Sequence, residues 1–188
     1  MTSRRCTRTS TFPKRCSSTR SQPVILGIDP GTTGMGYAFL VAGSDRATLI
    51  ECGLIEIPRG VLGAERLVAI ADALDLLIRR HHPGALAVER LFFNKNAKTA
   101  MAVSEARGVA LLCGARAGLE IAEYTPQQVK TNVAGHGGAD KKAVQKMLSH
   151  LVALDAPITQ DNVADAVAIA LTHLQRAQFA AVVAAASP

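Results

Sequence analysis

The chain lacks the cysteine and histidine patterns that mark zinc sites and disulfide frameworks. Its five histidines show no H-E-x-x-H or comparable ligand spacing, which argues against a His-ligated zinc site. None of its four cysteines belongs to a C-x-x-C pair (Cys6, Cys16, Cys52 and Cys113). These absences favour a reducing compartment. No continuous apolar run approaches the roughly 20 residues of a membrane span, so we expect a cytoplasmic protein with no membrane partner.

Acidic residues are absent from the first 22 positions, which hold six basic residues (Arg4, Arg5, Arg8, Lys14, Arg15 and Arg20). This segment is rich in Ser and Thr and has no hydrophobic period, so we predict a disordered basic extension over residues 1–22. Its composition is similar to that of a transit peptide, but it has no apolar stretch of a secretory signal. An added leader upstream of the true domain start is the simplest explanation. We place the folded domain at residues 23–180 and a C-terminal tail at 181–188.

Basic residues outside that extension are concentrated in the middle of the chain. The formal net charge is +6, and residues 23–188 contain equal numbers of basic and acidic side chains. Between positions 90 and 146, however, basic residues outnumber acidic ones by nine to four. A basic surface beside an acidic pocket suits a phosphodiester substrate. The alternative is that Lys141, Lys142 and Lys146 form only a solvated helix face.

Apolar patterning predicts a single α/β domain, since 188 residues suffice for one well-buried core. Period-two and short apolar runs predict strands over 24–29, 35–42, 48–57, 85–89 and 119–123. Helical periodicity predicts helices over 64–80, 97–117, 125–133, 140–151 and 161–178. Three closely spaced strands followed by alternating strands and helices indicate a mixed five-stranded sheet flanked by helices.

Two carboxylates end apolar strands, and a third lies in an apolar helix. Asp29 follows the run 24–28, Glu89 follows 85–88, and Asp165 lies within 161–169. Hard divalent cations such as Mg²⁺ bind oxygen ligands and combine a few protein carboxylates with substrate phosphate. This pattern predicts a metal-dependent nuclease.

Structural explanations cover only some of the acids. An aspartate before Pro-Gly is a common turn residue, and Asp161 fits the first turn of a helix. Glu89 is harder to explain, because a buried, unpaired glutamate at the end of a central strand costs several kcal/mol. Asp165 faces small residues that indicate close packing, which capping does not explain.

Two other groups of residues have open interpretations. Phe92 and Phe93 are adjacent in a polar loop of a chain with only seven aromatic side chains, so Phe92 is either a core residue or a wedge that stacks on an unpaired base. Lys130, Lys141 and Lys142 are candidate phosphate clamps, but they are equally ordinary as surface lysines.

The order of several motifs resembles the bacterial RuvC-type Holliday-junction resolvases over about residues 24–175. The matching blocks are Ile25-Leu26-Gly27-Ile28-Asp29-Pro30-Gly31, Ala87-Val88-Glu89-Arg90-Leu91-Phe92, Lys95-Asn96, Ala106-Arg107-Gly108-Val109-Ala110, Gln128-Val129-Lys130 and Ala164-Asp165-Ala166-Val167-Ala168-Ile169-Ala170. The resemblance implies a ribonuclease-H-like fold, a homodimer, and paired nicks across four-way DNA junctions in recombination and repair. It also implies Mg²⁺ or Mn²⁺ as cofactor, two ions per site, and the RuvA and RuvB branch-migration proteins as partners.

The resemblance also assigns roles by position. Asp29, Glu89 and Asp165 match the family's acidic metal ligands. The DNA-binding positions are Phe92, as the junction-probing aromatic, together with Lys95, Asn96, Lys130 and Lys141. One position departs from the family, which usually has an acid or a histidine three residues before the last aspartate, whereas this chain has Asn162. Its carbonyl oxygen can still ligate but brings no charge, so we place Asn162 fourth in the catalytic and metal-binding set, with Asp161 as the alternative.

Two competing hypotheses remain. The segment Asp29-Pro30-Gly31-Thr32-Thr33-Gly34 is similar to the first phosphate loop of sugar kinases and actin-like ATPases, although those proteins need two such lobes and this chain has room for one. Asn162 also suggests a junction-binding module with little or no cleavage.

Overall fold

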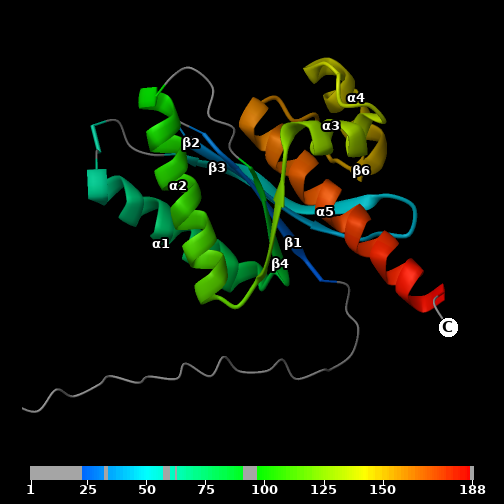
Figure 1. The fold of residues 1–188 in the computed structure, drawn as a ribbon, viewed down its shortest axis with the longest axis horizontal. Helices are drawn as coiled ribbons and strands as arrows, with labels where there is room; N and C mark the ends of the chain where they lie inside the picture. The colour runs from blue at the N-terminus through cyan, green and yellow to red at the C-terminus, as the bar shows by residue number, and fades with distance from the viewer. Residues whose placement is uncertain (1–22, 32–33, 57–59, 62, 91–96, 187–188) are drawn as a thin grey trace, which may run out of the picture.

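A computed structural model describes residues 23–31, 34–56, 60, 61, 63–90 and 97–186, with the backbone alone for residues 97–99. Six strands form one sheet, namely β1 (Ile25–Pro30), β2 (Gly34–Val41), β3 (Ala47–Glu56), β4 (Ala85–Glu89), β5 (Glu120–Tyr124) and β6 (Val152–Ala153). Their order across the sheet is β5-β4-β1-β2-β3-β6 (Figure 1). The prediction of five strands was therefore short by one, because a two-residue strand such as β6 has no readable period.

The sheet is mixed, as the spacing of the strands predicted. β1, β2 and β3 form an antiparallel meander. β4 and β5 are added in parallel on the other side of β1, and β6 pairs in parallel with the start of β3. The carboxyl ends of β1, β4 and β5 therefore meet at one edge of the sheet.

Five helices cover the two faces of the sheet in the described part of the chain (Figure 1). α1 (Gly63–His81) and α2 (Ala97–Arg116) pack on one face over a core that includes Leu26, Ile28 and Val88. α5 (Asp161–Ala186) packs on the other face, with α3 (Pro126–Ala134) and α4 (Lys141–Leu151) beside it, over a core that includes Ile25 and Ala87. Since side chains alternate along a strand, odd-numbered residues of β1 and β4 point toward α5.

Small residues allow α5 to lie close against the sheet. A Cβ atom at Gly27 would overlap Ala166 and Ala170 of α5, and one at Gly36 would overlap the backbone of Asn162. Between Val163 and Leu174, every α5 residue except Asp165 is buried. Asp165 therefore marks a polar opening in this stretch of the interface.

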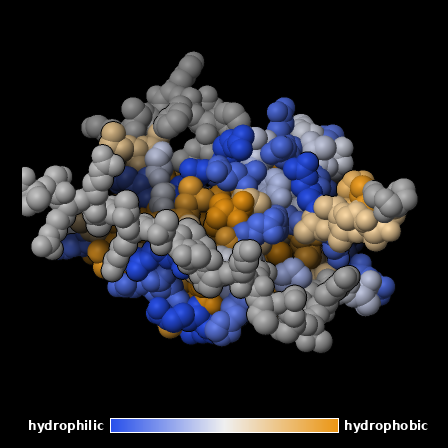
Figure 2. All heavy atoms as spheres, turned by 60° about the horizontal axis from the view of Figure 1, so that its bottom comes forward, coloured by the Kyte–Doolittle hydropathy of each residue, from blue (hydrophilic) through white to orange (hydrophobic). Residues whose placement is uncertain are grey.

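α5 continues beyond its predicted end at residue 178 and reaches Ala186, so most of the predicted tail at 181–188 is helical. Alanine has the highest helix propensity, and this stretch is alanine-rich. By length and composition α5 is long and apolar enough to cross a membrane, which the sequence had not led us to expect. Half of its most apolar window is buried inside the domain, which is typical of a core helix. The second half is exposed and forms the apolar projection at the right of Figure 2.

Candidate active site

Asp29 and Glu89 lie at the ends of two neighbouring parallel strands. The register of β1 and β4 pairs Ile28 with Val88, so the two carboxylates occupy the next position along each strand. Both have odd numbers in their strands and therefore point to the α5 face. α5 crosses this end of the sheet with Asp165, its one incompletely buried residue between Val163 and Leu174. The structure thus brings together the three acids that the sequence singled out.

The three carboxylates disfavour one another's charge. Burial raises the pKa of Asp29 to about 7, and the charges of Glu89 and Asp165 add to this effect. Burial followed by the charge of Asp165 raises the pKa of Glu89. Burial likewise raises the pKa of Asp165, against the opposing effect of Lys141. Such a cluster gains stability when a cation neutralises it.

The chemistry of the donors fits a hard divalent cation. All three are carboxylates, and Mg²⁺ and Mn²⁺ prefer oxygen ligands. Within the described ranges, no three Asp, Glu, His or Cys side chains already stand in a metal-binding arrangement, so the carboxylates must adjust to enclose an ion.

Two lysines border the same site. A pocket of about 210 Å³ is lined by Glu89, Asp165, Lys130 and Lys141 together with apolar residues of α3, α4 and α5. Lys141 Nζ lies 3.0 Å from Asp161 Oδ2 and 3.7 Å from Asp165 Oδ2. The sequence could not distinguish a phosphate clamp from a solvated face, and the structure places both lysines against the acidic pocket.

Local capping fixes the helices that present these lysines. Thr125 and Gln128 form a reciprocal capping box at the start of α3, with Pro126 at the first helical position. Asp140 caps α4 by accepting a hydrogen bond of 2.7 Å from the backbone N–H of Ala143. Lys141 is thus the first residue of α4 and projects from a fixed helix end.

Asn162 and Asp161 are placed differently. Asn162 packs beside Gly31, and its amide Nδ2 donates a hydrogen bond of 3.4 Å to the Gly34 carbonyl. The Asp161 side chain is 62% exposed and pairs with Lys141. Asn162 therefore lies next to the turn that follows Asp29, and Asp161 lies at the outer rim.

Three predicted DNA-binding residues, Phe92, Lys95 and Asn96, lie outside the described residues. The sequence did not indicate that Arg107 and Glu123 belong to the site, because their contacts join elements that are distant in the chain. Arg107 Nε of α2 donates a hydrogen bond of 3.1 Å to the carbonyl of Glu89, and its Nη2 pairs with Glu123 of β5. The sequence held two signals for Arg107: a charged residue inside an apolar helical pattern, and its place in the matching block Ala106-Arg107-Gly108-Val109-Ala110.

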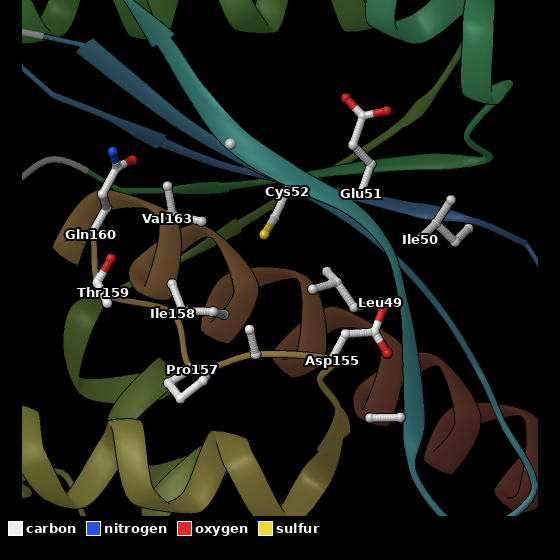
Figure 3. Close-up of a pocket in the computed structure, with 13 residues that line it drawn as sticks. Leu49, Ile50, Glu51, Cys52, Asp155, Pro157, Ile158, Thr159, Gln160 and Val163 are labelled. Carbon is white, nitrogen blue, oxygen red and sulfur yellow. The ribbon is translucent and has the colours of Figure 1, made fainter.

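A second, larger hollow of about 370 Å³ lies between β3 and the segment 153–160 (Figure 3). Cys52 points toward this hollow, whereas Glu51 points away from it (Figure 3). Its lining contains none of the residues predicted as catalytic, metal-binding or DNA-binding.

Comparison with known proteins agrees with this geometry. The family model described as crossover junction endodeoxyribonuclease RuvC matches residues 25–173. The chain belongs to the RuvC family. Its relatives include crossover junction endodeoxyribonucleases RuvC from Pelotomaculum thermopropionicum, 47% identical over 80% of this chain and 92% of the relative, and from Moorella thermoacetica, 49% identical over 80% and 90%. This family is one of metal-dependent nucleases, which sets aside the kinase-like ATPase hypothesis.

Solved structures give the same assignment. T. thermophilus RuvC in complex with a Holliday junction substrate is 33% identical, with a TM-score of 0.79 over 84% of this chain and 96% of that one. The yeast mitochondrial Holliday junction resolvase Ydc2 is 14% identical with a TM-score of 0.61, which supports the fold alone. The predicted ribonuclease-H-like architecture is confirmed.

Proposed function

We propose that this RuvC-family endonuclease resolves four-way DNA junctions by paired, metal-dependent hydrolysis of phosphodiester bonds. The observation that supports this most strongly is the cluster of Asp29, Glu89 and Asp165, whose pKa values are all raised and which opens toward Lys130 and Lys141. Acids that share a pocket with lysines suit a reaction in which cations hold an anionic substrate.

Asp29, Glu89 and Asp165 would hold Mg²⁺ or Mn²⁺, with two ions per site. Bound divalent cations supply positive charge to the reacting phosphate and to the leaving 3′ oxygen. We assign the fourth ligand to the side-chain carbonyl of Asn162, because it lies one helical turn from Asp165. Its neutral oxygen makes the second ion the more weakly held one.

Lys130 and Lys141 would hold the phosphate backbone beside the carboxylates. Lys141 is already drawn toward the site by Asp161 and Asp165, so it can neutralise charge that develops in the transition state. Phe92 would stack on an unpaired base at the junction, with Lys95 and Asn96 binding nearby phosphates. Water supplies the nucleophile, and no covalent intermediate is needed.

The described part of the chain contains one such site, and a symmetric four-way junction needs two nicks. The active species we propose is therefore a homodimer. We also propose that the protein acts in the cytoplasm, with the RuvA and RuvB branch-migration proteins as partners.

The direct test is nicking of a synthetic four-way junction and of a linear duplex with the same arms, in Mg²⁺ and in EDTA. We expect paired nicks in the junction with Mg²⁺, little cleavage of the duplex, and none in EDTA. Tight junction binding without nicks in either Mg²⁺ or Mn²⁺ would instead identify a junction-binding module.

A further inference from the structure

The peptide group that joins Glu89 to Arg90 is hydrogen-bonded at both of its polar ends. The N–H of Arg90 donates to the carbonyl of Tyr124 in β5 over 2.7 Å. The carbonyl of Glu89, which points the opposite way in a trans peptide, accepts a hydrogen bond of 3.1 Å from Arg107 Nε. Two bonds on opposite sides fix the plane of this peptide.

The second bond replaces a strand partner that is missing at this position. The β1–β4 register ends with the pair Ile28 and Val88, so Glu89 lies one residue beyond the last pair on that side. An unpartnered carbonyl at a half-buried strand end is costly and poorly oriented. Arg107 supplies the donor from α2, on the sheet face opposite α5.

Glu123 fixes Arg107 in turn. The Arg107 side chain is only 19% exposed, and its Nη2 forms an ion pair with Glu123 of β5. Arg90 approaches the same carboxylate more loosely, at 3.8 Å, and is 57% exposed. The planar fork of arginine can donate to a carbonyl and a carboxylate at once, whereas lysine has a single ammonium group.

We propose that Arg107, held by Glu123, is a positioning residue that sets the direction of the Glu89 carboxylate for metal binding. Fixing the plane of the 89–90 peptide fixes the direction in which the Glu89 side chain leaves the backbone. The Glu89 carboxylate then has a smaller range of positions to search before it binds an ion. This inference rests on the proposed function, because it assumes that Glu89 binds metal.

The test measures Mn²⁺ binding to the full chain without DNA by titration calorimetry, together with thermal unfolding and junction binding in EDTA. Loss of such supporting contacts typically weakens metal binding by about 10- to 100-fold, which is the expected result for Arg107→Met. Arg107→Lys should recover little of the lost Mn²⁺ affinity, since lysine lacks the planar guanidinium group. Arg116→Met removes the same charge from an exposed position of α2 and should bind Mn²⁺ like the parent.

Glu123→Gln provides a milder variant should Arg107→Met fold poorly, and we expect several-fold weaker Mn²⁺ binding with near-parental thermal stability. Glu89→Gln is the reference. Parental Mn²⁺ affinity in Glu123→Gln and in a folded Arg107 variant, alongside a clear loss in Glu89→Gln, would overturn the positioning role and leave the proposed metal site intact. Unchanged Mn²⁺ binding in Glu89→Gln itself would overturn both the positioning role of Arg107 and the proposed metal site.

Discussion

At the scale of single residues, Asp29 is held where its charge is disfavoured. It shares the site with the half-buried Glu89 and Asp165, and burial and their charges raise its pKa to about 7. The charged carboxylate therefore destabilises the metal-free protein, and a bound cation removes this destabilisation. Asp29 should therefore reduce the stability of the metal-free protein at alkaline pH while it is essential for activity.

The stability of the metal-free protein should consequently depend on pH. Because the pKa is about 7 in the folded state and about 3.9 in the unfolded state, the folded state binds more protons between these values. In EDTA, the contribution of Asp29 to the free energy of unfolding is therefore highest below about pH 4. It falls as the pH rises to 7, by on the order of 4 kcal/mol. Asp29→Asn should flatten this part of the profile and raise the melting temperature at pH 8. The measurement is thermal unfolding at pH 5 and pH 8. An equal change in melting temperature between these pH values in parent and variant would contradict the raised pKa of Asp29.

Asn162 gives a second prediction at this scale. Asn162→Asp adds a carboxylate one turn from Asp165 and removes the hydrogen bond to Gly34, so nicking in Mg²⁺ should increase. Mn²⁺ binds nitrogen and oxygen donors more strongly than Mg²⁺, so it should support faster cleavage by the parent, and the gap should narrow in the variant. Junction nicking in each metal measures this. If the variant changes neither rate while Asp161→Asn abolishes both, Asp161 is the fourth ligand.

At the scale of elements, the site depends on how closely α5 approaches β1 and β2. The strand ends that position Asp29 and Glu89 were predictable from apolar runs, and Asp165 from its place in an apolar helix. The continuation of α5 to Ala186 was not, because an alanine-rich stretch has no hydrophobic period to follow. β6 and the Arg107 contact escaped prediction since one is two residues long and the other joins α2 to a distant strand.

Gly36→Ala tests this close approach. A Cβ atom there would overlap the backbone of Asn162, so we expect a loss of stability of about 1–3 kcal/mol, as is typical of overpacking, and reduced nicking as α5 is displaced. Gly138→Ala is the matched control, because its nearest contact would be 3.8 Å away on the His136 side chain. Denaturant unfolding and junction nicking of both variants provide the measurement, and parental behaviour of Gly36→Ala would show that α5 has room to move.

At the scale of the whole molecule, charge is divided between a domain that is neutral overall and a basic N-terminal segment. Deleting residues 1–22 removes six cations but none of the carboxylates or lysines of the site. We expect nicking at low salt to persist and the salt dependence of junction binding to become shallower, because each phosphate contact contributes to the slope. Binding titrations over a salt series measure it. A folded but inactive truncated chain would show that the segment takes part in the reaction.

The family and the sheet architecture could be predicted because motifs spread over the whole domain agree in order. The arrangement of the site could be predicted only in part. Which lysines face the acids, and where Asn162 points, depend on the packing of α3, α4 and α5 and not on any local pattern. The side-chain roles of Phe92, Lys95 and Asn96 remain predictions.

If Asp29 anchors the metal centre of a junction resolvase, one variant should separate cleavage from DNA binding. Asp29→Asn keeps the size of the side chain and removes its charge, so junction nicking in Mg²⁺ and Mn²⁺ should be abolished. Junction binding in EDTA should stay close to that of the parent, because phosphate contacts carry the affinity. Substantial nicking by this variant in either metal would show that Asp29 is not needed to hold the metal.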